Sequence, residues 1–135
     1  MLGGIRHITR LAVLSAALVP APSQADRALA DLGSETLRLF ATCTGRLSAK
    51  LEYQWLIGDP ASDITEAQRN SMADLLEAVA PDGSGSLVMI YRIDAKIAYR
   101  QLLERARFAP DPADAQWAEA RADAILAPCT AMLLA

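Results

Sequence analysis

The side chains that could carry chemistry in this chain are two cysteines, a single histidine and a larger set of acids and arginines. The histidine is His7, and it lies in an N-terminal segment that we expect to be removed. Without it, the mature chain lacks the usual general base at neutral pH and cannot build a Ser-His-Asp site or a histidine-ligated metal site. The sequence therefore predicts no enzyme, no cofactor and no metal site.

Two carboxylates keep one catalytic alternative open. Glu52 and Asp94 stand among largely apolar residues, and a buried acid with a raised pKa can act as a general acid. A histidine-free hydrolase using two carboxylates is thus a minor hypothesis. We favour the alternative in which each acid pairs with a nearby arginine or lies on the surface.

The two cysteines predict one disulfide between Cys43 and Cys129. An even pair of cysteines in an oxidising compartment indicates a disulfide, whereas a redox catalyst would need a Cys-x-x-Cys pair, which is absent. A bridge that closes so long a loop stabilises a protein by roughly 4 to 5 kcal/mol in the chain-entropy treatment. Two buried free thiols are the alternative.

A basic line and a pair of tryptophans are the candidate binding features. Arg92, Lys96 and Arg100 are spaced by four, so they share one face of a helix and could meet an acidic partner or an anionic ligand. The alternative is a solvated face paired with acids of the preceding helix, namely Glu66, Asp74 and Glu77.

Trp55 and Trp117 fall near the ends of predicted helices, as do Ile64 and Phe108. In an antiparallel bundle these four side chains are expected at one end of the molecule. Aromatic clusters of this kind are favoured in binding sites. They can equally form a packed plug, so we predict either a cleft or a plug at that end.

The first 25 residues have the three parts of a secretory signal peptide. Arg6 and Arg10 precede the apolar run 11–19, and Ser23 and Ala25 supply small residues before a cleavage site between Ala25 and Asp26. Crossing a bilayer takes roughly 20 apolar residues, so this run favours a cleaved signal over a permanent anchor. We expect an exported, periplasmic protein with no transmembrane segment in its mature form.

Removing residues 1–25 takes away two of the 13 basic residues and none of the 16 acids, so the net charge moves from −3 to −5. Nucleic-acid binding normally requires a basic surplus, and the mature chain has none. We therefore expect no nucleic-acid partner.

Apolar residues recur at helical spacing in four segments, 34–57, 63–80, 86–108 and 111–134. Asp63 with Glu66, Ser86, and Asp111 before Pro112 are the expected N-terminal caps, and Pro128 should bend the last helix. Short loops between long helices favour antiparallel neighbours. The sequence thus predicts an all-α, up-down four-helix bundle forming one domain, 26–135, held by one disulfide.

For function, these patterns favour a small periplasmic accessory or structural protein that has no catalytic role and binds another periplasmic or envelope protein. The candidate surfaces are the basic line and the tryptophan end. A protein that binds an apolar or anionic small molecule is the alternative.

The mass of the protein purified from its own cells tests the signal and the disulfide together. We expect a chain that begins at Asp26 and is lighter by two hydrogen atoms than its reduced form, because the signal is removed and the cysteines are oxidised. A chain that retains residues 1–25 would contradict the predicted cleavage.

Overall fold

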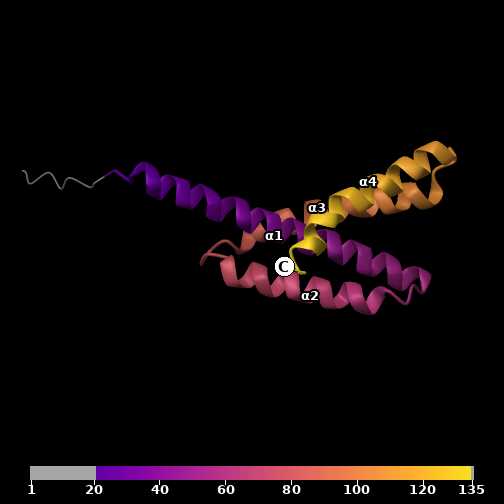
Figure 1. Cartoon of the computed structure of the whole chain (residues 1–135), viewed down its shortest axis with the longest axis horizontal. Helices are drawn as coiled ribbons and strands as arrows, with labels where there is room; N and C mark the ends of the chain where they lie inside the picture. Colours follow the sequence, from indigo (N-terminus) through magenta and orange to yellow (C-terminus); the bar gives the residue numbers. More distant parts are fainter. Residues whose placement is uncertain (1–20, 135) are drawn as a thin grey trace, which may run out of the picture.

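The computed structural model describes residues 21–134, which form four α-helices and no strand. These are α1 (Gln24–Ile57), α2 (Ser62–Val79), α3 (Gly85–Phe108) and α4 (Pro112–Ala131). Consecutive helices run in opposite directions, as Figure 1 shows. The predicted all-α fold with four helices is confirmed, whereas the predicted signal peptide falls mainly on residues outside the described range.

The helix ends agree only in part with the predicted caps. Asp111 caps α4 as expected, since its side chain accepts a hydrogen bond from the Ala113 N–H. The other two predicted caps are wrong. Helix α2 follows Ala61 and α3 follows Ser84, and neither residue makes a capping side-chain hydrogen bond. The turn before α2 is held instead by the Asp59 side chain, which accepts a hydrogen bond from the Ala61 N–H at 2.9 Å.

Helix α1 is longer than predicted because a capping box starts it ten residues earlier. The Ser23 hydroxyl accepts a hydrogen bond from the Asp26 N–H, and the Asp26 carboxylate accepts one from the Ser23 N–H. The Ser23 hydroxyl also donates a hydrogen bond to the Asp26 carboxylate, and this bond, followed by the one from the Ser23 N–H, lowers the pKa of the Asp26 carboxyl. Residues 24–35 form an exposed arm that extends beyond the other helices (Figure 1). Helix α4 ends at Ala131, short of the predicted Leu134.

The core is organised around α1, which packs on both α2 and α3, while α4 packs chiefly on α3. Three small clusters of buried side chains fill these contacts. They centre on Leu37, Ala41 and Leu76; on Cys43, Leu47, Met72 and Cys129; and on Ala49, Tyr99, Leu103 and Ala122. Direct contact between α1 and α4 is much smaller than a closed four-helix bundle would give. The molecule is therefore two helical hairpins, α1–α2 and α3–α4, joined by the packing of α3 on α1.

Tyr99 is the largest fully buried side chain among the described residues. Its hydroxyl has no hydrogen-bond partner within residues 21–134. Burial raises the pKa of Tyr99 to about 12; the charge of Asp123 acts in the same direction and that of Arg46 opposes it. The phenol therefore stays neutral and serves as a packing group between α1, α3 and α4.

The two hairpins approach each other closely at Gly45. A Cβ atom at that position would collide with the Arg92 carbonyl oxygen and lie only 3.2 Å from the Cβ of Ala95. Gly45 is buried in the middle of α1, where glycine is otherwise unfavourable. The absence of a side chain here lets the backbone of α1 rest directly on α3.

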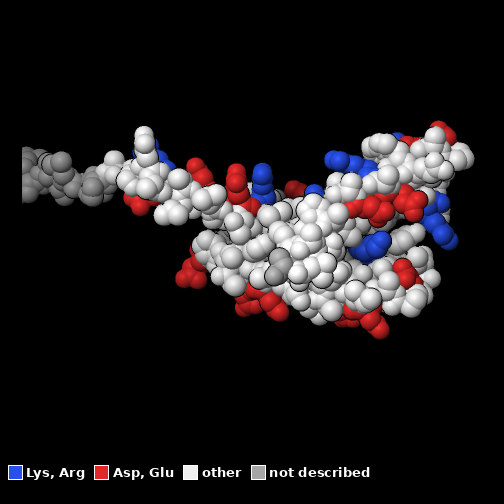
Figure 2. All heavy atoms as spheres, in the orientation of Figure 1, with Lys and Arg blue, Asp and Glu red and all other residues white. Residues whose placement is uncertain are grey.

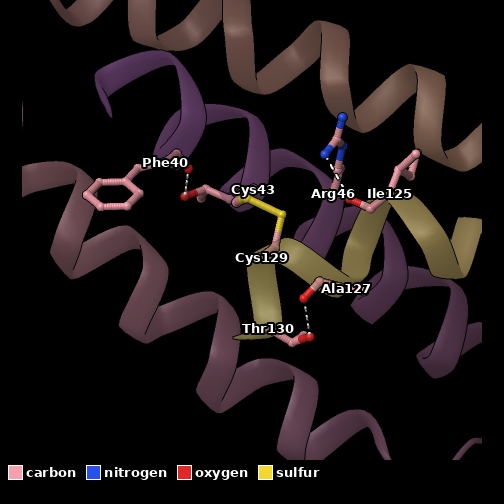
Figure 3. The surroundings of a disulfide bond; sticks show 8 residues. Phe40, Cys43, Arg46, Ile125, Ala127, Cys129 and Thr130 are labelled. Carbon is pink, nitrogen blue, oxygen red and sulfur yellow. Dashed lines mark hydrogen bonds between the residues drawn. A yellow bond between two sulfur atoms is a disulfide. The ribbon is translucent and has the colours of Figure 1, made fainter. Parts of the chain in front are cut away.

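The predicted disulfide is confirmed, and it joins α1 to α4 (Figure 3). Cys43 and Cys129 are completely buried, with Cα atoms 5.4 Å apart. Beside the bridge, Arg46 donates a hydrogen bond to the carbonyl oxygen of Ile125, three residues before Pro128 (Figure 3). Helix α4 pairs with α3 and meets α1 mainly around this bridge.

Replacing Gly45 with alanine tests the close crossing. We expect G45A to lower the free energy of unfolding by about 1 to 3 kcal/mol, the usual range for an overpacked core, because the collision is with backbone atoms that cannot rotate away. The measurement is chemical denaturation followed by circular dichroism.

The matched control is G33A in the exposed arm, where a Cβ has no neighbour within 4 Å. This change should leave the stability unchanged or raise it, since alanine favours helix more than glycine does. Equal effects of the two substitutions would contradict a special role for Gly45.

Candidate functional site

Beyond the Gly45 crossing, α1 and α3 stay packed through Ala49, Tyr99 and Leu103, and they separate toward their C-terminal ends, so that the tips of the two hairpins lie apart (Figure 1). Figure 2 shows the surface hollowed between these tips, with side chains of both charges beside the hollow. Two neighbouring hollows lie along the separating helices, and both reach Glu52. Together we call them the α1–α3 groove.

The first hollow, of about 340 Å³, lies over α1 between α2 and α3. It combines an apolar surface with three cationic side chains and one acid. Its lining residues are Gly45, Ser48, Leu51, Glu52, Trp55, Arg69, Met89, Arg92, Ile93 and Lys96. Because it contains the larger number of cations, we call it the basic hollow.

The second hollow, of about 400 Å³, lies between the C-terminal halves of α1 and α3. Most of its lining surface is apolar, with charged groups at its border. Its lining residues are Ala49, Glu52, Tyr53, Leu56, Ile57, Arg100, Glu104, Arg107 and Phe108. Leu56 and Phe108 are 85% and 75% exposed, so this hollow is open to solvent and offers unburied apolar surface.

Helix α3 exposes more apolar side chains than it buries. Only Tyr99 and Leu103 are buried, whereas a row of large apolar residues spaced by four lies exposed on another face. Met89 and Ile93 of this row line the basic hollow together with Trp55 of α1. We define the groove face as Trp55, Leu56, Ile57, Met89, Ile93, Ile97 and Phe108, all of them exposed. A monomeric soluble protein rarely leaves so many neighbouring apolar groups uncovered unless they bind something.

The predicted basic line lies along this groove, but its acidic partners differ from those considered. Lys96 forms an ion pair with Glu52 of α1, and Arg100 pairs with Glu104 one turn further along α3 at 3.1 Å. Neither pair involves the α2 acids. Arg92 has no carboxylate within 4.0 Å among residues 21–134. Two of the three cations in the basic line are therefore paired with acids, Lys96 with Glu52 and Arg100 with Glu104, and Arg92 is the one that has no acidic partner among the described residues.

The two tryptophans do not meet. Trp55 lies in the basic hollow near the α1–α2 tip, and Trp117 lies near the α3–α4 tip, where the Arg105 guanidinium stands 4.8 Å from its ring centre. Arg105 also bonds to Asp114, which raises the pKa of Arg105 and lowers that of Asp114. Both indoles are about half exposed, at 55% and 53%. The prediction that both tryptophans meet in one cleft or plug is therefore wrong, because the hairpins diverge and each indole lies at a different tip.

The two carboxylates considered for catalysis, Glu52 and Asp94, have different surroundings. Glu52 pairs with Lys96 across the groove, and Asp94 is exposed. Arg69 of α2 was not identified from the sequence, yet it lines the basic hollow, and its Nε is buried without a hydrogen-bond partner among residues 21–134. No sequence pattern marks Arg69, because its place depends on how α2 lies against α1.

Comparison with known proteins gives no relative: no protein-family model, curated protein or solved structure matches this chain. Within residues 21–134, none of the helices is long and apolar enough to cross a membrane. In the same range, no group of three or more His, Cys, Asp or Glu side chains is arranged to hold a metal ion.

Replacing Glu52 tests whether its ion pair with Lys96 contributes to the stability of the fold. Both side chains are more than a third exposed, and such pairs contribute about 0 to 1 kcal/mol, so we expect E52Q to change the unfolding free energy by no more than that. Thermal and chemical denaturation of E52Q beside the unmodified protein measure the difference. A loss well above this range would mean that the pair is a structural requirement of the α1–α3 packing.

Proposed function

We propose that this chain is an exported, non-catalytic accessory protein that binds another protein of the periplasm or cell envelope through the α1–α3 groove. The observation that carries the proposal is the groove face, in which seven large apolar side chains of two helices are exposed, six of them lining the two hollows. Burying them against a partner would remove this apolar surface from water, which is the main favourable term in protein association.

The composition of the groove also supports a protein partner. Tryptophan and arginine are enriched among the residues that dominate binding energy, and Trp55 and Arg92 line the same hollow. Apolar side chains four residues apart on α3 form a row of the kind that receives a partner helix.

Two features support export. Residues 1–25 have the pattern of a cleaved signal peptide, and a buried disulfide of this kind is typical of proteins that fold in an oxidising compartment.

The small-molecule alternative has one observation in its favour. The two hollows, at about 340 and 400 Å³, fall within the range of ligand pockets. Both open widely to solvent along the groove, whereas a typical ligand pocket encloses most of its guest. We therefore place it second.

The test is a double substitution, I93D with I97D, which puts two charges into the apolar row at positions that are already about half exposed. We expect the variant to fold normally and to lose the partner that co-purifies with the unmodified protein from its own envelope fraction. The matched control, L75D with V79D, places the same charges on exposed apolar positions of α2 away from the groove. Partner capture that survives I93D/I97D, or that both variants lose equally, would refute the groove as the binding surface.

A further inference from the structure

The groove carries more positive than negative charge, although the whole chain is negative. Five cationic side chains line its two hollows: Arg69, Arg92, Lys96, Arg100 and Arg107. The acids lining them are Glu52 and Glu104, which pair with Lys96 and Arg100. The surplus is three positive charges on a chain whose formal net charge is −3. This local reversal of sign favours an occupant that carries negative charge.

The surplus resides in three arginines. Among the described residues, no carboxylate lies within 4.0 Å of Arg69, Arg92 or Arg107. The Nε atom of Arg69 is, in addition, buried without any hydrogen-bond acceptor. A buried guanidinium N–H without an acceptor is costly, and a carboxylate is the acceptor whose geometry matches the guanidinium fork. The one carboxylate of the basic hollow, that of Glu52, pairs with Lys96, so Arg69 and Arg92 are left without an acidic partner there.

The spacing of these arginines also indicates how long the bound segment must be. Arg92 and Arg107 are 15 residues apart on α3, which corresponds to about 22 Å along the helix axis. Ile93 and Ile97 of the groove face lie between these two positions, Met89 lies just before Arg92, and Phe108 directly follows Arg107. An occupant that satisfies all of these groups must be elongated, apolar along one side and acidic near both ends.

We propose that the α1–α3 groove receives an amphipathic helix of the partner protein, with carboxylates about four turns apart at the two ends of its apolar side. Arg69 and Arg92 bind the carboxylate at one end, and Arg107 binds the one at the other. This inference rests on the proposed function, since it names the kind of segment through which the partner is bound.

The test uses three synthetic 20-residue helical peptides with the same leucine-rich side. Their end positions carry glutamate, glutamine or lysine, and binding to the full-length purified protein is measured by isothermal titration calorimetry. We expect the glutamate peptide to bind at least about tenfold more tightly than the lysine peptide, a difference of the size that one good interfacial charge pair provides. The preference should weaken as salt is raised.

Reversing the charges of Arg69 and Arg92 tests whether these two arginines bind the carboxylate at one end of the partner helix. The double variant R69E/R92E should reverse the preference, so that the lysine peptide binds more tightly than the glutamate peptide. The matched control R27E/R38E makes the same change of charge on the N-terminal part of α1, away from the groove, and should keep the original preference. A reversal in both variants would overturn the assignment, because it would reflect only the overall charge of the protein.

The remaining outcomes separate this inference from the proposed function. Equal binding of all three peptides would overturn the carboxylate sites while leaving an apolar protein-binding groove. Binding of decanoate, used as a small apolar carboxylate, with no binding of any peptide would overturn the helix in favour of a small-molecule site. A concentration-dependent rise in mass that R69E/R92E abolishes would identify a second copy of this chain as the occupant, which also overturns the proposal.

Discussion

At Gly45 the backbone of α1 lies against the backbone of α3 with no side chain between them, and most of the architecture depends on this contact. Side chains normally keep packed helices 8 to 10 Å apart, and a glycine at the crossing lets the helix axes approach more closely. On one side of the crossing, Leu37 and Ala41 pack toward α2 and α3. On the other side the helices separate, and their separation creates the groove.

The disulfide complements this crossing at the other end of the chain. Helix α4 packs chiefly on α3, so the α3–α4 hairpin is anchored to α1 by the Gly45 crossing and by the Cys43–Cys129 bridge. The hydrogen bond from Arg46 to Ile125 adds a polar contact beside the bridge. Two anchors close to the middle of α1 fix the hairpin at its base while its tip stays apart from the α1–α2 tip. An open groove can therefore persist in a chain whose core clusters are small.

The groove combines two properties that rarely occur together on a surface without a partner. Its apolar side chains are exposed rather than packed, and its arginines exceed its acids in a chain of net negative charge. Apolar surface favours association with little directional preference, whereas unpaired guanidinium groups select the sign and geometry of what binds. The two properties together support a binding protein with a defined class of partner.

Local sequence patterns determined the four helices, the loops between them and the pairing of Cys43 with Cys129, because helix periodicity and cysteine number depend little on long-range packing. They also placed Arg92, Lys96 and Arg100 on one face of α3. Only the tertiary structure decided that the hairpins diverge, that Trp55 and Trp117 lie apart, and that Arg69 joins the groove. The reason is physical: a crossing is set by the contact between two distant segments, here Gly45 and the backbone at Arg92, and neither segment alone specifies its neighbour.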